Sequence, residues 1–188
     1  MVRAGALYHD IGKIGRPNFF IENQAVGMNP HDRLNYLKSA EVIIEHVHNG
    51  VKMAQKHKLP APIIEFIATH HGTTKANYFF IKHQQENPGK DINEQPFIYP
   101  GPLPKSKEAA VVMLVDGIEA ASRSMKEKTR DNLEGLINSM IDKKIADRQL
   151  DDSDLTFRDI NTIKQTLLQK LINIYHIRIE YPKEKKDE

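Results

Sequence analysis

Apolar residues recur along this chain mostly at spacings of three and four, and strict alternation of apolar and polar residues is hard to find. Such spacing is typical of amphipathic helices and not of strands. One segment, residues 38–57, places on a single stripe Ile43, Val47, Val51 and Ala54. The next, residues 60–72, begins with prolines and ends at Gly72, the usual asymmetry of a helix. We therefore expect an all-α fold in which these two segments form a helical hairpin.

The middle of the chain has signals for a loop and a further helix. Between Gly72 and Lys105 the residues are mostly polar with scattered aromatic side chains, which predicts a short helix and a long loop. The proline-rich residues 99–104 cannot be helical, and Ser106 is then placed to cap a long apolar helix. Long loops of this kind are often functional.

The last helix is predicted to begin after Thr156. Asp159 occupies the second position of a capping box, and Leu155 and Ile160 form a hydrophobic staple. The expected inward positions of this helix are Ile160, Ile163, Leu167, Leu171 and Ile174. The pattern therefore predicts an amphipathic helix near the end of the chain.

Composition narrows the chemistry that this fold can carry. The 188 residues are enough for one core, and we expect a single domain over residues 1–182 followed by a solvated, disordered tail at 183–188. The formal charge of +2, with both signs interspersed, gives no broad basic field for nucleic acid. No apolar run approaches the ~18 residues of a membrane span. Because cysteine is absent, any metal must be bound by His, Asp or Glu.

The predicted helices carry such ligands at unusual positions. His9 and Asp10 are adjacent in "LYHDIGK", and alone they would be interpreted as a surface pair. His70 and His71 close an apolar helix, where a buried polar group without a partner costs about 1–3 kcal/mol. These imidazoles therefore need partners, and a metal ion would be one.

Two further residues complete the set. His46 flanks an apolar face beside Gly50, and Asp116 lies in the apolar run "VVMLVDGIEA", where an unpaired carboxylate would be costly. Each candidate, taken alone, is better explained as a satisfied core or cap residue. Together they form an ordered series of His-Asp, His, His-His and Asp, whose nitrogen and oxygen ligands suit iron or manganese.

This series, with the words around it, resembles a known family. The stretches "GALYHDIGK", "FFIEN", "NPHD", "HHGT" and "YPGPLPKSKEAAVVMLVDGIEAASRS" are similar to the HD-domain phosphohydrolase superfamily. Within it they most resemble the cytoplasmic HD domain of seven-transmembrane HD proteins of the PgpH type, which hydrolyse cyclic di-AMP. The resemblance covers the chain from Val2 to about Pro182. It implies an HD-domain helical bundle, a cyclic di-AMP substrate and a cytoplasmic domain of a protein in the bacterial cell membrane.

The resemblance also implies a mechanism with two divalent metal ions, iron or manganese. Asp10 bridges the two ions, and water activated between them attacks phosphorus in line to give the linear dinucleotide pApA. The remaining ligands are divided between the ions as His9 and Asp116 on one and His46, His70 and His71 on the other. Asp10 is thus expected to act in catalysis as well as in metal binding.

Lys13 and the residues after the His-His pair are the expected substrate contacts. Gly12 allows the chain to turn, so that the ammonium group of Lys13 reaches a phosphate oxygen during catalysis. Lys13 is also explained as a cation that complements the dipole at a helix end. The other expected contacts, which a capped turn and a core aromatic would explain as well, are Gly72, Thr73, Thr74 and Tyr78.

The superfamily pattern begins with another histidine on an upstream helix, but only eight residues precede His9. We therefore expect one ion to lack a ligand and apolar surface to be exposed where that helix would pack. His31 in "NPHD" is a further candidate, although this word also predicts a simple turn. The remaining histidines are expected on polar or outward-facing positions, namely His48, His57, His83 and His176.

Two other functions stay open on the residues alone. One is a non-catalytic module that senses a nucleotide and signals to a membrane partner. The other is an HD phosphohydrolase that acts on a different nucleotide, because a dinuclear metal site can cleave many phosphoesters. The oligomeric state is also open, a homodimer included.

Overall fold

The computed structural model describes residues 1–24 and 27–176, and this part of the chain is helical with no strand. A single isolated bridge joins Lys75 to Ile98. Seven α-helices are α1 (Val2–Tyr8), α2 (Tyr36–Lys56), α3 (Ala61–Thr69), α4 (Asn77–Glu86), α5 (Lys107–Ser124), α6 (Arg130–Ala146) and α7 (Phe157–Ile174). Short 3-10 helices are η1 (Ile11–Gly15), η2 (Pro17–Phe19), η3 (Ile21–Asn23), η4 (Pro30–Arg33) and η5 (Gln95–Phe97). The predicted all-α fold is confirmed, while the predicted tail at 183–188 lies outside the described residues.

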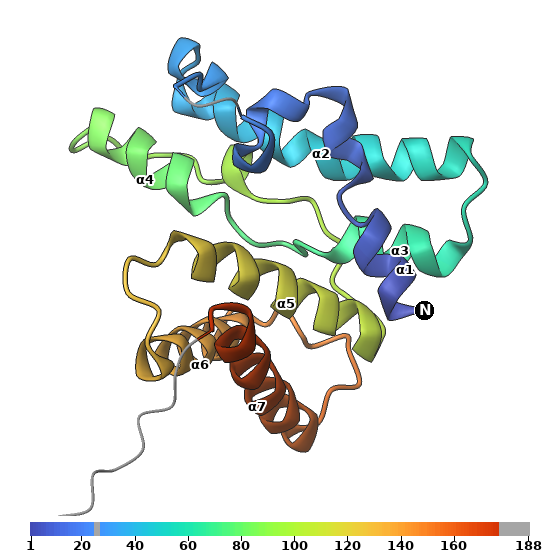
Figure 1. Cartoon of the computed structure of the whole chain (residues 1–188). Coiled ribbons are helices and arrows are strands. Elements are labelled where there is room, and N and C mark those ends of the chain that lie inside the picture. The colour runs from blue at the N-terminus through green and yellow to red at the C-terminus, as the bar shows by residue number, and fades with distance from the viewer. Residues whose placement is uncertain (25–26, 177–188) are drawn as a thin grey trace, which may run out of the picture.

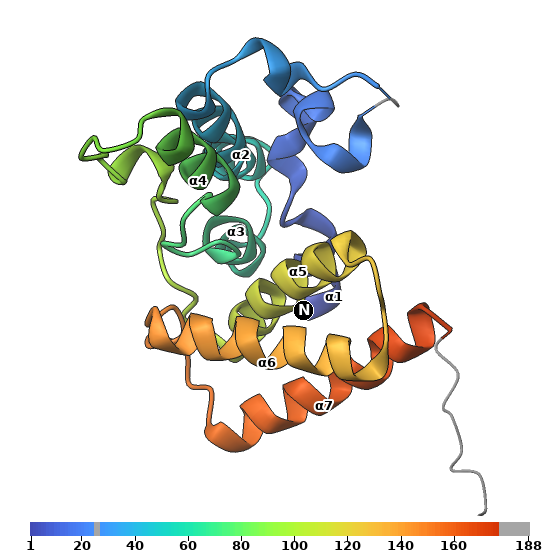
Figure 2. The same ribbon diagram turned by 90° about the vertical axis from the view of Figure 1, so that its left-hand side faces the viewer.

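Helix α5 lies between two groups of helices (Figures 1 and 2). On one side are α1 to α4, and α1 and α3 contact α5 directly. On the other side α6 and α7 pack on each other, and α6 contacts α5. The core of this second group includes Met113, Leu114, Leu133, Ile137 and Leu171. Because α5 borders both groups, Asp116 on this helix is held against the first group by a core formed with the second.

The predicted helix starts are confirmed in atomic detail. The Ser106 hydroxyl accepts a hydrogen bond from the backbone N–H of Ala109 and caps α5. At the start of α7, the Thr156 hydroxyl accepts from Asp159 N–H while the Asp159 carboxylate accepts from Thr156 N–H. Lys107 of α5 donates to the same carboxylate, so the capping box also ties α7 to α5.

The predicted inward stripe of α7 is partly wrong. Ile160 and Leu171 are buried, but Ile174 is 61% exposed, and Leu168 and Ile172, which were not expected inside, are buried. Both ends of α7 are also joined to α5, through Asp159 at its start and Tyr175 just after its end. The Tyr175 hydroxyl, just after α7, lies 2.9 Å from the Ser122 hydroxyl of α5.

A buried glutamine links the C-terminal helices to the turn after α3. The side chain of Gln149, which follows α6, accepts a hydrogen bond from Thr73 N–H at 2.9 Å and donates to the Thr73 hydroxyl at 2.9 Å. Beneath it, Gly72 has φ +53°, and a Cβ at this position would overlap Gln149 and Met113. The turn that follows His71 is therefore fixed from the far side of the molecule.

We expect Gln149→Leu to lower the free energy of unfolding by about 1–3 kcal/mol, because Thr73 N–H would lose its buried acceptor. Urea unfolding followed by circular dichroism measures this change. The matched control is Gln165→Leu on the exposed side of α7, which should change stability by less than about 0.5 kcal/mol. Equal stability of the two variants would show that Gln149 does not fix the turn.

Candidate functional site

Two glycines bring the His9-Asp10 segment against α2. Gly12 in η1 is buried, and a Cβ there would overlap the backbone carbonyl of His46 and the backbone nitrogen of Gly50. Gly12 was expected to allow the chain to turn, and its φ is not in the left-handed region that favours glycine. The glycine is needed for close approach, which places Asp10 beside His46.

Three histidines are oriented in the same way. The Nδ1 atom of each one lies within hydrogen-bond distance of the backbone carbonyl three residues earlier. The pairs are His9 with Ala6, His46 with Ile43 and His70 with Ile67. Since a carbonyl only accepts, Nδ1 carries the proton, and in the neutral ring Nε2 has a free lone pair. Metal-binding histidines are typically oriented by a hydrogen bond of this kind.

The carboxylate of Asp10 lies between these imidazoles. Its Oδ2 atom is 3.2 Å from His9 Nε2, while Oδ1 is 3.4 Å from His46 Nε2 and 3.6 Å from His70 Nε2. On the far side, His9 Nε2 is also 3.4 Å from Asp116 Oδ1. The two oxygens of one carboxylate therefore face two different groups of possible ligands.

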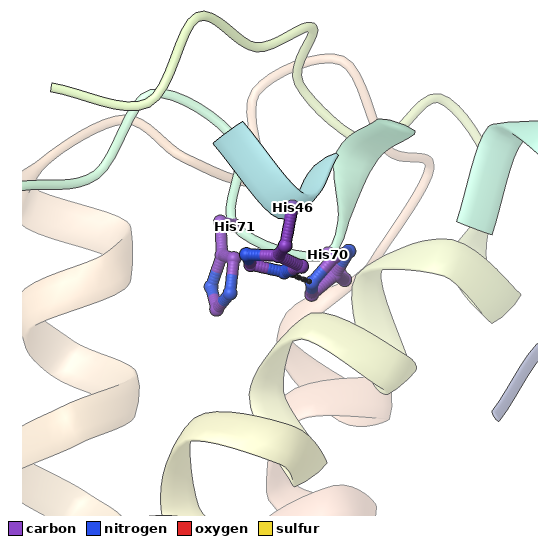
Figure 3. A group of neighbouring side chains, drawn as sticks. All are labelled: His46, His70 and His71. Carbon is purple, nitrogen blue, oxygen red and sulfur yellow. Dashed lines mark hydrogen bonds between the residues drawn. The ribbon is translucent and has the colours of Figure 1, made fainter. Parts of the chain in front are cut away.

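The six predicted ligands form two groups that could each hold a metal ion. His46, His70 and His71 make one group, and His9, Asp10 and Asp116 make the other. Within each group the ligand atoms all lie within 4.8 Å of one another. Figure 3 shows the three rings of the first group, from α2 and the end of α3, close together. The structure thus brings together every residue that the sequence predicted as a ligand.

The ligand atoms of both groups are arranged in a way that suits a bound cation. His46 Nε2 and His70 Nε2 are 3.0 Å apart, although each ring has its Nδ1 proton committed to a carbonyl. Two ligands bound at about 2.1 Å and at right angles have this separation. In the other group, His9 Nε2 and Asp10 Oδ1 are buried and have no hydrogen-bond partner among the described residues. The carboxylate oxygen needs a positive charge beside it, and His9 Nε2 can bind either a proton or a metal ion.

Burial and neighbouring charges shift the pKa values of three histidines in this centre. Burial alone would lower the pKa of His9, but the close carboxylates of Asp10 and Asp116 outweigh burial and raise this pKa to about 10. In the protein alone, the proton on His9 is the counter-charge that the two carboxylates require, and a bound cation would replace it. Burial and the neighbouring imidazoles lower the pKa of His70 and of His71, so both rings stay neutral and keep a lone pair for a metal.

Lys13 is placed beside this centre. Its Nζ atom is 2.7 Å from Asp10 Oδ2 and 2.7 Å from Glu22 Oε1, and it lies 4.9 Å from the centroid of the Phe20 ring. Burial would lower the pKa of Lys13, but the charge of Asp10 and the hydrogen bonds to Asp10 and Glu22 outweigh burial and raise it. The ammonium group stays charged at the edge of the ligand set.

The four residues expected to contact the substrate after the His-His pair differ in their exposure to solvent. Gly72 is buried and shapes the turn, and the Thr74 hydroxyl donates to the carbonyl of His71. Thr73 is exposed although its hydroxyl is bonded to Gln149. Tyr78, at the start of α4, is 65% exposed. Of these four residues, Tyr78 is therefore the most accessible to a ligand.

The sequence did not predict a role for two residues that lie near the centre or act on it. The buried ring of Tyr99 stacks on His71 with centroids 4.2 Å apart and covers one side of the first group. Lys144 on α6 is partly buried and has no ion pair with a described residue, and its charge acts on Asp116 and on His71. Burial lowers the pKa of Lys144 to about 8.

A cavity of about 860 Å³ opens beside the second group, between α1 and α5. His9, Asp10, Lys13 and Asp116 line one part of it. Its apolar wall includes Val2, Ala6, Val111, Val112 and Val115. The upstream helix that would fill it stays a prediction.

The remaining histidines stay outside the two ligand groups. His48, His57 and His176 are exposed, and His83 is partly buried beside the ring of Phe97. His31 lies within hydrogen-bond distance of the carbonyl of Phe19, and it belongs to neither group of possible ligands. Within residues 1–24 and 27–176, no helix has both the length and the apolar character needed to cross a bilayer.

The sequence of this chain is similar to the sequences of curated proteins. A cyclic-di-AMP phosphodiesterase PgpH of Bacillus subtilis is 42% identical over 182 residues, which are 97% of this chain and 25% of the relative. The protein of the same name in Listeria monocytogenes is 41% identical over 185 residues, 98% of this chain and 26% of the relative. This chain therefore spans about a quarter of the length of these curated relatives.

A solved structure and a family model agree with these relatives. The crystal structure of the L. monocytogenes PgpH HD domain in complex with cyclic di-AMP matches with a TM-score of 0.89 and 40% identity, over 93% of this chain and 80% of that one. The family model described as HD domain matches residues 1–121, which hold all six predicted ligands. By this match and by the ligand series that it contains, the chain belongs to the HD domain family.

Proposed function

We propose that this chain is a metal-dependent phosphodiesterase that opens cyclic di-AMP to the linear dinucleotide pApA. The observation that carries this proposal is the placement of Asp10, whose two oxygens face two groups of metal-ligand atoms while Lys13 contacts the same carboxylate. The relatives named as cyclic-di-AMP phosphodiesterases and the neighbour solved with cyclic di-AMP support the choice of substrate.

His46, His70 and His71 would hold one ion, and His9 and Asp116 the other, with Asp10 between them. The nitrogen and oxygen ligands favour iron or manganese. When bound, the two divalent ions supply Lewis-acid charge and acidify water for in-line attack on phosphorus. The second group offers fewer imidazoles and is more exposed, so we expect it to bind its ion less tightly.

The remaining chemistry belongs to residues of this chain. The ammonium group of Lys13 neutralises charge on a phosphoryl oxygen, because Glu22 and Asp10 hold it at the edge of the centre and keep it protonated. Tyr99 excludes water from one side of His71. Lys144 adds positive charge that acts on His71 and on Asp116.

We also propose that the parent protein is anchored in the bacterial cell membrane through segments outside this chain, with the HD domain in the cytoplasm. The basis is the resemblance to seven-transmembrane HD proteins, together with the fourfold greater length of the relatives. Fractionation of cells that express the parent protein, with an antibody against this chain, tests the assignment. Recovery in the soluble fraction would contradict it.

We expect His46→Ala and His70→Ala each to lower metal content by about one ion per chain and to abolish hydrolysis of cyclic di-AMP. Substitution of a residue that only hydrogen-bonds to a metal ligand already lowers metal affinity ~10–100-fold, so loss of a ligand itself should have at least this effect. Elemental analysis of the purified chain after dialysis measures the metal content. His57→Ala, an exposed histidine outside both groups, is the matched control and should change neither property. Normal metal content in the His70 variant would remove His70 from the ligand set.

We expect cyclic di-AMP to be hydrolysed faster than cyclic di-GMP, because a site that pairs with adenine leaves the additional polar groups of guanine unpaired. Initial rates with manganese, with separation of products by liquid chromatography, compare the two substrates. Equal rates would favour a phosphohydrolase of broader substrate range. Metal-loaded protein that binds cyclic di-AMP without cleaving it would favour a sensing module.

We expect an upstream extension of one natural helix with its histidine to increase both metal occupancy of the His9 group and turnover. The helix would cover the apolar wall between α1 and α5 and add one ligand. Metal content and turnover are compared for the short chain, the long chain and a long chain in which only that histidine is alanine. If the short chain already holds two tightly bound ions and matches the turnover of the long chain, no upstream ligand is needed.

A further inference from the structure

His71 is held differently from the other three histidines of the ligand set. In His9, His46 and His70, Nδ1 donates to a backbone carbonyl three residues earlier. The ring of His71 has no hydrogen bond with any residue that the structure describes. Helix α3 ends at Thr69, so His71 lies outside the helix, in the turn that follows it. The place of this ring therefore depends on the backbone of the turn and on what packs against the ring.

Two neighbouring rings limit the tilt of the His71 imidazole. The Tyr99 ring stacks on it with centroids 4.2 Å apart and an interplanar angle of 28°, and the centroid of the His70 ring is 4.1 Å away. Tyr99 also donates its backbone N–H to the carbonyl of Thr74 at 2.9 Å, so the same residue supports the end of the turn. This packing sets the plane of the ring, whereas the position of the ring follows the backbone.

The backbone of this turn is held by the side chain of Gln149. Its Oε1 atom accepts from Thr73 N–H at 2.9 Å, while Nε2 donates to the Thr73 hydroxyl at 2.9 Å and to the carbonyl of Asp147 at 3.0 Å. The amide therefore has a partner for its oxygen and for both of its hydrogens. Gln149 is only 5% exposed, so water cannot readily replace these partners.

Gly72 allows this amide to lie close to the ligand. It directly follows His71 and has φ +53°, and a Cβ at this position would overlap Gln149 and Met113. Gln149 thus fills the space beside the glycine and binds the chain at the second residue after the ligand. Metal–ligand distances vary by only about 0.2 Å, so a small movement of this turn would be felt by a bound ion.

The other two imidazoles of the first group do not depend on this contact. His46 and His70 are oriented by the carbonyls of Ile43 and Ile67, within or next to their own helices. A change at Gln149 should therefore displace one ligand of three and leave two in place. This difference separates a role in positioning the ligand from general support of the fold.

We propose that Gln149 is a positioning residue for the metal ligand His71 and acts on it through Thr73. The contact keeps the third imidazole within reach of the ion that the first group would hold. The inference rests on the proposed function, because it takes this group to bind a metal ion. It assigns part of the affinity for that ion to a residue between α6 and α7, beyond residues 1–121 that match the HD domain family.

The test is a titration of the metal-free chain with cobalt(II), whose visible absorption depends on the number and geometry of its ligands. Gln149→Met removes the amide and keeps an unbranched side chain that can fill the same space. We expect the first cobalt ion to bind about tenfold more weakly to this variant, because contacts that support a metal ligand have effects of this size. Its spectrum should move toward that of His71→Ala, which lacks the third imidazole.

A second variant removes the other partner of the same contact. Thr73→Val has no hydroxyl for Gln149 to bind but keeps its backbone N–H. If the two residues act through one contact, the double variant should weaken cobalt binding by less than the product of the two single effects. Single effects that multiply would overturn the route through Thr73.

Leu168→Ala is the matched control for a general loss of stability. Leu168 is buried in the core of the C-terminal helices, and its truncation should destabilise the chain at least as much as Gln149→Met. At a temperature where circular dichroism shows both variants to be folded, Leu168→Ala should leave the affinity for cobalt and the spectrum unchanged. Equal weakening of cobalt binding in the two variants, or unchanged binding in Gln149→Met, would overturn the positioning role.

Metal binding is measured without turnover, so the inference and the proposed function can fail separately. Cobalt affinity that depends on Gln149, in a chain that does not cleave cyclic di-AMP, would retain the positioning residue and reject the proposed function. Cleavage together with cobalt binding that is insensitive to Gln149→Met would do the opposite. A chain that binds no cobalt at the first group would overturn both.

Discussion

The partly buried carboxylate of Asp10 lies among the Nε2 atoms of His9, His46 and His70, and the rest of the structure depends on this arrangement. A buried charge is costly unless it is paired, and lone pairs that face one another add to the cost. The fold tolerates the cluster because backbone carbonyls fix each imidazole and a glycine contact brings Asp10 to α2. A cation at either ligand group relieves both costs, so metal binding should also stabilise the fold.

Much of this arrangement could be predicted from the sequence, because its signals are local. A capping residue such as Ser106 or Thr156 contacts the backbone of the same helix turn, so its role depends on neighbours along the chain. The ligands were conspicuous for another reason. Polar residues such as His70 and Asp116 occur where the helical period requires apolar ones, and they need partners wherever the chain folds.

The features that the sequence could not predict depend on distant contacts. Gln149 and Thr73 are 76 positions apart, and neither has a local pattern that marks it. Lys144 is one lysine among many until α6 packs against α5 and places its charge near Asp116. The exposed Ile174 has the same explanation, because the apolar period of α7 predicts a straight stripe while the buried face is set by how the helix crosses its neighbours.

Positive and negative side chains lie on different sides of the metal-ligand groups. Lys13 contacts the carboxylate of Asp10 at the metal-ligand groups, whereas a second cavity, lined in part by Phe20, also has Asp32 and Glu86 in its wall. Because carboxylates repel anions, a phosphate is favoured beside Lys13 and disfavoured beside Asp32 and Glu86. Lys144, like Gln149, lies beyond residues 1–121, where the family model ends. The C-terminal helices thus support, through Gln149, the turn that follows the His70 and His71 ligands.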